Sequence, residues 1–288
     1  MKQNITLLLF SLISCILIAE IILRINGKYL SYSEQCIEDG EYVSPYSKDN
    51  LGWAHTPQPF SVWKDEKAEF TTFWIANNEG LKDKNISLKK EGLRVFILGD
   101  SFTEGVGAPN DSAYPRVLEK LLSANSDTPI EVINCGISGA DIFSEYKLLK
   151  NKMLKYKPDY VIVTLNSSDF IDYIYRGGFE RFLQNNEMQY KKAPWFEPLY
   201  AKSHIVRHIV HDGYDLGFDF LNPQEREQMM LFANKMIVQA IDSFQNLCTR
   251  NKIKFSMVFH PLKQEFTVNN YPLLNLIKHV TPPKNRTV

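Results

Sequence analysis

Residues 93–105 read LRVFILGDSFTEG, and this stretch decides the fold class. Its start, residues 93–98, is a short apolar run that ends at Gly99, which is typical of a strand buried within a parallel sheet. Apolar residues then recur at helical spacing through residues 114–124. The stretch therefore predicts a strand, a tight turn and a helix, which is the repeating unit of an α/β protein.

The rest of the chain repeats this alternation. Further strands are predicted at 130–134, 160–165 and 255–259, and further helices at 143–154 and 224–248. Residues 172–223 are aromatic, contain several prolines and are predicted to be irregular. The alternation predicts a three-layer α/β/α fold of the flavodoxin-like type, with helices on both faces of a parallel sheet.

The N-terminal segment is predicted to meet a membrane. Residues 5–25, ITLLLFSLISCILIAEIILRI, are nearly all apolar and long enough to cross a bilayer as a helix. Signal peptides usually have a shorter apolar region and a small-residue cleavage site, so an uncleaved anchor is favoured over a cleaved signal. A lipoprotein signal, with LISC at 12–15 ending in Cys15, is a third alternative, but the apolar run continues past Cys15. Positive charges at both ends leave the orientation open.

Three segments are expected along the chain. Residues 1–28 form the transmembrane anchor, 29–91 a β-rich lead-in and 92–288 the main domain. The lead-in carries aromatic residues and turn formers, such as LGW at 51–53 and NNEG at 77–80, which fit short strands better than helices.

Composition excludes several functions. The formal net charge is zero, so the electrostatic footprint of a nucleic-acid binder is missing. The cysteines form no C-x-x-C pair, which leaves buried free thiols as the favoured interpretation. They are Cys15, Cys36, Cys135 and Cys248. The glycines match neither a P-loop nor G-x-G-x-x-G, and no cofactor or metal is expected.

Ser101 is the candidate nucleophile. It lies in the turn that directly follows the first predicted strand, and ligands of open α/β sheets bind at the carboxyl ends of strands. A helix beginning just after Ser101 would direct backbone N–H groups at a developing oxyanion. A serine that only caps this helix would have the same spacing.

Residues 95–105, VFILGDSFTEG, resemble the first block of the SGNH/GDSL hydrolases, whose serine is the nucleophile. NCGISG at 134–139 and NSSD at 166–169 resemble the second and third blocks, in the family's order. The resemblance implies that Gly139 donates a backbone N–H to the oxyanion hole. The family's asparagine donor falls on Ser168, while Asn166 lies two residues earlier, and the sequence leaves both alternatives open.

The family's last block is D-x-x-H, in which the histidine is the general base. No such block follows residues 255–259, so the domain is expected to be C-terminally incomplete. A truncation, a frameshifted gene or an inactive relative would each explain this. His260 ends a predicted strand and is the substitute to consider, although packing at the strand end is the simpler interpretation. His279 is weaker still.

Two other groups of side chains have simple interpretations. His204, His208 and His211 have the spacing of one helix face, but no H-E-x-x-H motif supports a zinc site. A solvated or interfacial helix face is therefore favoured. Arg176 and Arg181 are expected to form a salt-bridged turn rather than an anion site.

The resemblance implies an ester hydrolase or acyltransferase. The expected partner is an acyl ester, such as an O-acetyl group on an envelope polysaccharide, and the membrane is met through the N-terminal helix. The main domain is expected outside the cytoplasm, in the periplasm or on the cell surface. The alternative is a non-catalytic glycan-binding or assembly module that keeps the fold.

Overall fold

The computed structural model describes residues 2–26, 37–38, 41–42, 58–66, 70–182, 195–213, 223–261, 263 and 265. Three features singled out above, LGW at 51–53, Cys36 and His279, lie outside these residues. Cys135 and Cys248 are buried free thiols, and Cys15 is an exposed one.

A four-stranded parallel sheet forms the centre of the molecule, with the strand order β6-β5-β7-β8. The strands are β5 (Leu93–Gly99), β6 (Ile130–Gly136), β7 (Tyr160–Leu165) and β8 (Lys254–Phe259). Each predicted strand is confirmed to within two residues. The apolar runs were a strong signal because β5 and β6 bury almost every side chain on both faces.

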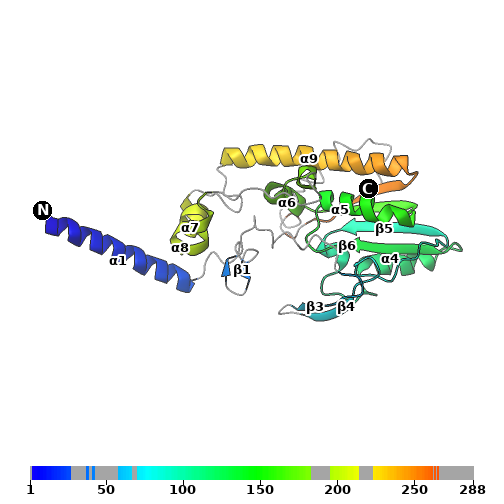
Figure 1. The fold of residues 1–288 in the computed structure, drawn as a ribbon, viewed down its shortest axis with the longest axis horizontal. Helices are drawn as coiled ribbons and strands as arrows, with labels where there is room; N and C mark the ends of the chain where they lie inside the picture. Colours follow the sequence, from blue (N-terminus) through cyan, green and yellow to red (C-terminus); the bar gives the residue numbers. More distant parts are fainter. Residues whose placement is uncertain are drawn as a thin grey trace.

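Helices cover both faces of this sheet (Figure 1). On one side α4 (Tyr114–Ser123) packs against β6, and on the other lie α5 (Ile142–Leu148) and α9 (Pro223–Arg250). The buried face of α9 has the predicted spacing of three or four residues. It consists of Ala233, Ile237, Ala240, Ile241, Phe244 and Cys248. The mixed α/β architecture with a parallel sheet is thus confirmed.

Two predictions of local structure were wrong. At 143–154 a single α-helix was expected, but the α-helical conformation ends at Leu148. The chain stays helical as a π-helix, Leu149–Met153, and then a 3-10 helix, Leu154–Tyr156. Pro158 disfavours the helical conformation in the residue before it, and Lys157 has the positive φ of 52° that ends the helix.

The segment predicted to be irregular is largely helical where the structure describes it. It contains most of α6 (Ser168–Arg176), a 3-10 helix at Phe179–Phe182, α7 (Glu197–Lys202), α8 (His204–His208) and a π-helix at Ile209–Gly213. Pro198 does not break α7, because it stands in the first turn, where no helical N–H is lost.

The N-terminal helix α1 (Lys2–Asn26) extends away from the sheet domain (Figure 1). Within it, the span Asn4–Asn26 contains an 18-residue window with a mean hydropathy of 2.6, and none of that window is buried. Its length and composition suit a membrane span, although a signal sequence has the same properties. The lead-in contributes two short hairpins, β1 (Ile37–Glu38) with β2 (Glu41–Tyr42), and β3 (Val62–Glu66) with β4 (Thr71–Ile75).

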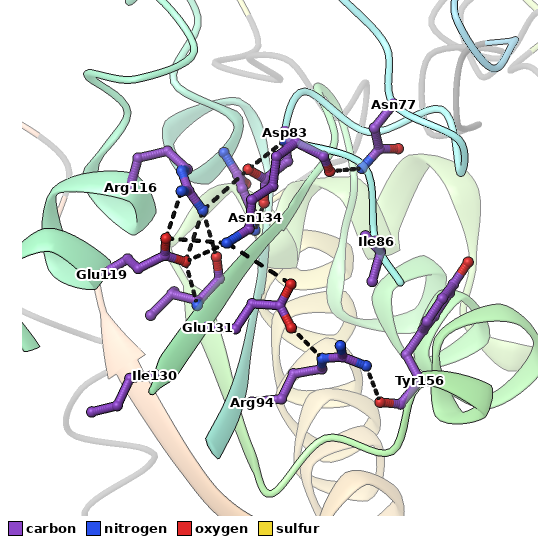
Figure 2. A network of polar contacts seen from close by, with 12 residues as sticks. Asn77, Asp83, Ile86, Arg94, Arg116, Glu119, Ile130, Glu131, Asn134 and Tyr156 are labelled. Atoms are coloured by element: carbon purple, nitrogen blue, oxygen red, sulfur yellow. Dashed lines mark hydrogen bonds and ion pairs between the residues drawn. The ribbon is translucent and has the colours of Figure 1, made fainter. Parts of the chain in front are cut away.

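A set of charged side chains, here called the amino-edge network, joins the lead-in to the start of the sheet (Figure 2). Its members are Asp83, Arg94, Arg116, Glu119 and Glu131. Arg94 Nε donates to Glu131 at 2.6 Å, and Arg116 Nη2 donates to Glu119 at 2.6 Å. Asp83 accepts a hydrogen bond of 2.7 Å from the backbone N–H of Asn134 in β6. These contacts fix residues 77–86 against β6 and α4.

Candidate active site

Ser101 is the first residue of the short helix α3 (Ser101–Glu104), directly after β5. Asp100 caps this helix, with its carboxylate accepting a hydrogen bond of 2.9 Å from the Phe102 N–H. A Cβ on Gly99 would lie 2.0 Å from the hydroxyl oxygens of Thr103 and Thr164, so only glycine fits the turn. The tight turn leaves Ser101 half-buried at the carboxyl edge of the sheet.

The loop after β6 packs directly on this turn. Ile137 N–H donates to the Gly99 carbonyl at 3.0 Å, and the Ser138 hydroxyl donates to the Glu104 carboxylate. Gly139 has a φ of 71°, in the left-handed region that glycine adopts without strain. Its carbonyl accepts a hydrogen bond of 2.6 Å from Arg176. The loop that carries Gly139 is therefore held beside α3.

The loop after β7 is tied to the same place. Asn166 Nδ2 donates to the Asp100 carboxylate at 2.6 Å, and Asn166 Oδ1 accepts from the Ser168 N–H at 2.7 Å. Both polar ends of the Asn166 amide thus hold loops together. Ser168 is half-buried, and its hydroxyl makes no hydrogen bond to any residue that the structure describes.

Beneath these loops lies a group of buried carboxyl groups, here called the acid cluster, which consists of Asp141, Glu145 and Asp169. Asp169 accepts hydrogen bonds from the N–H groups of Asn166, at 3.0 Å, and Ile142, at 3.1 Å, and so links the second and third loops. Glu145 Oε2 is buried and has no hydrogen-bond partner within the described part of the chain.

The electrostatics of the acid cluster differ among its members. Burial raises the pKa of Glu145 well above its usual range, and the neighbouring charges of Asp169, Asp100 and Asp141 add to this. Burial likewise raises the pKa of Asp169. For Asp141, the pair with Arg181 outweighs burial and lowers the pKa. Glu145 and Asp169 therefore keep their protons to a higher pH than an ordinary carboxyl group, whereas Asp141 releases its proton at a lower pH.

Arg176 and Arg181 form the expected salt-bridged structure. Arg181 binds Asp141 through both terminal nitrogens, at 2.6 and 2.7 Å, and Arg176 pairs with Asp172 at 3.0 Å. Both guanidinium groups are buried, which confirms the structural interpretation.

His260 reaches the same edge of the sheet. Its backbone N–H donates a hydrogen bond of 2.7 Å to the Leu165 carbonyl. Its exposed ring lies 4.3 Å from the Phe102 ring, measured between centroids. Phe102 is the residue after Ser101. Among the described residues, no imidazole or carboxylate accepts a hydrogen bond from the Ser101 hydroxyl.

Two of the three histidines singled out above, His204 and His208, lie in α8. His208 Nδ1 lies 2.9 Å from Asp212 Oδ2, and His204 begins α8. No group of three or more His, Cys, Asp or Glu residues within the described ranges could hold a metal ion.

Sequence reasoning missed the bond between Asp100 and Asn166 and the whole acid cluster. The only signal was polar residues placed directly after strands, because the contacts join segments that are far apart in the chain. It did find the three loops that meet here, which follow β5, β6 and β7.

These loops lie in the part of the chain that matches a family model. The model describes the GDSL-like lipase/acylhydrolase family and matches residues 97–261, which is more than half of the chain. The chain belongs to this family. The match begins within β5 and ends just after β8, so it contains all three loops and His260.

Solved structures of the family are only distantly similar. The crystal structure of AlinE4, an SGNH-hydrolase family esterase, shares 18% identity over 67% of this chain and 99% of its own, with a TM-score of 0.28. TesA shares 15% identity over 56% of this chain and 76% of its own, also with a TM-score of 0.28. No curated protein gave a match. The assignment to the family rests on the family model.

Proposed function

We propose that this chain acts on ester bonds as a serine hydrolase or acyltransferase, with Ser101 as the nucleophile. One observation carries the proposal. The turn that bears Ser101 is bonded to the loop of Gly139 through Ile137 and Gly99, and to the loop of Asn166 through Asp100. The family match contains all three loops, and the resemblance implies that the nucleophile and the oxyanion donors come from them.

The oxyanion donors follow from the same contacts. The Gly139 N–H and backbone N–H groups at the start of α3 are the proposed main-chain donors. The Asn166 amide is engaged by Asp100 and Ser168, so Asn166 is proposed to position the loop. This leaves the Ser168 hydroxyl as the proposed side-chain donor. Removal of one such donor typically costs about 3–4 kcal/mol of transition-state stabilisation.

The proposed reaction forms and breaks an acyl-enzyme. Ser101 Oγ attacks the acyl carbonyl, the alcohol leaves, and the acyl group passes to water or to a sugar hydroxyl. A serine hydroxyl is a weak nucleophile and needs an adjacent base. Residues 1–288 contain no Asp-x-x-His after β8, and His260 is the imidazole whose ring contacts Phe102, the neighbour of Ser101 in the chain.

The test is hydrolysis of a small acetyl ester by the purified chain and by Ser101→Ala. For residues 1–288 we expect little turnover, and we expect turnover to appear when a C-terminal segment carrying Asp-x-x-His is added. Ser101→Ala should then abolish it. Robust turnover by residues 1–288 that is lost in His260→Ala would instead identify His260 as the base. Turnover that survives Ser101→Ala would refute the proposal.

The substrate and location are further parts of the proposal. We propose an O-acyl group on an envelope glycan, with α1 as an uncleaved anchor and the main domain outside the cytoplasm. A fusion of reporters after Val288 tests the topology. Activity of a fused reporter enzyme that works only in the cytosol, together with inactivity of one that works only outside it, would exclude this location.

The second candidate function is a non-catalytic glycan-binding or assembly module. It is favoured by the Ser101 hydroxyl, which donates to no base among the residues that the structure describes. Such a module would bind acetylated polysaccharide equally well in the wild type and in the Ser101→Ala variant, and would show no turnover with the added segment.

A further inference from the structure

Residues 195–213 form a small helical unit of their own, here called the collar. It consists of α7, α8 and the π-helix that follows. Tyr200 and Val210 are fully buried in it, and Phe196 and Val206 pack against them. Arg207 is also buried, and its Nε donates a hydrogen bond of 3.0 Å to the Tyr200 carbonyl. The collar thus has a core separate from the main core of the sheet domain.

The collar is bound to the end of α1 (Figure 1). The Glu20 carboxylate accepts hydrogen bonds from the Ser203 hydroxyl at 2.9 Å, the His204 N–H at 2.8 Å and the Ile205 N–H at 3.0 Å. Arg24 donates a hydrogen bond of 2.5 Å to the Lys202 carbonyl and one of 3.0 Å to the Glu20 carboxylate. The acidic residue that interrupts the apolar run is therefore bonded to the first turn of α8.

These contacts fix the height of the collar along α1. Glu20 lies six residues before the end of α1 at Asn26, or about 9 Å at 1.5 Å per residue. The apolar segment Asn4–Asn26 has 23 residues and a length of about 34 Å, slightly more than the hydrocarbon core of a bilayer. In a spanning α1, Arg24 lies at the interface, and Glu20 lies about one turn deeper, at the inner limit of the interface, together with the start of α8.

The collar also carries apolar side chains that nothing in the described structure covers. Trp195 is 84% exposed and Leu199 is 56% exposed. Trp195 lies in the turn just before the N-cap of α7, and Leu199 lies within the first turns of that helix, so both exposed side chains belong to the start of the collar. Tryptophan is enriched at membrane interfaces, where its ring is buried at the level of the headgroups.

We infer that the collar is an interfacial element that rests on the lipid bilayer beside α1, with Trp195 and Leu199 at the boundary between headgroups and acyl chains. The inference rests on the proposed membrane span of α1. The partner of the exposed side chains Trp195 and Leu199 is a lipid surface, because the collar is bonded to the membrane end of α1. The Glu20 contacts then hold the collar at the membrane end of α1.

The test uses the full chain in phosphatidylcholine vesicles whose acyl chains carry bromine either near the headgroup or deep in the bilayer. Bromine quenches tryptophan fluorescence on contact. We expect quenching from the shallow position that is mostly lost in Trp195→Phe. Trp63→Phe is the matched control, because Trp63 is an exposed tryptophan on the β3–β4 hairpin, and it should leave the quenching unchanged.

Flotation of the vesicles after an alkaline wash separates the two claims. Chain that floats, with the same quenching in wild type and Trp195→Phe, would overturn the collar while the anchor stands. Chain that does not float would overturn the anchor and the collar together. Glu20→Gln should reduce the Trp195 quenching without loss of flotation, because a neutral amide binds the α8 N–H groups more weakly. Unchanged quenching in this variant would overturn the role of Glu20.

Discussion

The two edges of the sheet treat buried charge in opposite ways. In the amino-edge network, each acidic side chain faces a cation, as Glu131 faces Arg94 and Glu119 faces Arg116 (Figure 2). At the carboxyl edge, Glu145 and Asp169 are buried together without a cation in direct contact among the described residues. Of the three members of the acid cluster, Asp141 alone pairs with a cation that the structure describes, Arg181.

The difference shows where this fold gains stability from ion pairs and where it buries carboxyl groups without a cation among the described residues. Paired ions with hydrogen bonds to the backbone, such as Glu119 with the Val132 N–H at 2.7 Å, fix the start of the sheet. Burial raises the pKa of Glu145 and Asp169 at the carboxyl edge, where no cation pairs with them among the described residues. At the amino edge burial also raises the pKa of Asp83, to about 6, although Asp83 lies 3.4 Å from Arg116. The two edges thus differ in ion pairing: the amino edge pairs its acidic side chains with cations, and the carboxyl edge, the proposed site of catalysis, leaves Glu145 and Asp169 without one among the described residues.

The largest effect is expected from Gly136→Ala, at the end of β6. The added Cβ would lie 2.1 Å from the backbone nitrogen of Glu104, so α3 and the Ser101 turn must move. We expect a loss of about 3 kcal/mol or more in the free energy of unfolding. Urea unfolding in detergent measures it. Gly213→Ala is the control, since a Cβ there meets no atom within 4 Å in the part of the chain that the structure describes. Equal stability of the two variants would contradict the close packing of α3 on β6.

The next effect concerns the amino-edge network. Arg94→Ala removes a buried guanidinium that binds Glu131 and, at 2.6 Å, the Tyr156 carbonyl. We expect a loss of about 2–4 kcal/mol, because Glu131 and a buried carbonyl lose their partner. Lys89→Ala, which breaks an exposed pair with Glu91, should change the same free energy by less than about 0.5 kcal/mol. A small loss in Arg94→Ala would show that the network contributes little rigidity.

The smallest effect, and the most specific, is the sign of the pH dependence at the two edges. Burial raises the folded-state pKa of Glu145, so its contribution to stability is present at low pH and is lost as the pH rises through that pKa. Glu145→Gln should therefore gain in Tm relative to wild type as the pH rises from about 5 to about 9.

Glu119 provides the opposite case. Although burial alone would raise its pKa, the hydrogen bonds from Arg116 and the Val132 N–H lower it below the usual value. Its contribution is present above the unfolded pKa and is lost as the pH falls through the folded pKa. Glu119→Gln should lose Tm at about pH 7 and recover toward wild type below about pH 4. The same sign in both variants would remove the contrast between the edges.

The sequence predicted the four strands, α9 and the three loops, because each has a local signal. Apolar runs mark β5 and β7, the spacing of Ile237 and Ile241 marks α9, and Gly99 marks the turn before Ser101. The spacing of His204 and His208 indicated the helix α8. The π-helix after α5, the helices α6 and α7 and the acid cluster were missed. The acid cluster depends on contacts between distant residues, such as Asp169 with the Ile142 N–H, which no local pattern contains.

The central claim is that Ser101 is the nucleophile of an ester-processing site, and covalent labelling with a fluorophosphonate probe tests it most directly. The purified chain is exposed to the probe, and the modified serine is located by mass spectrometry, with Ser101→Ala and Ser138→Ala in parallel. The account predicts an adduct on Ser101 that persists in Ser138→Ala, disappears in Ser101→Ala and forms faster once an Asp-x-x-His segment is added. An adduct on another serine, or no adduct on Ser101 with the added segment, would contradict it.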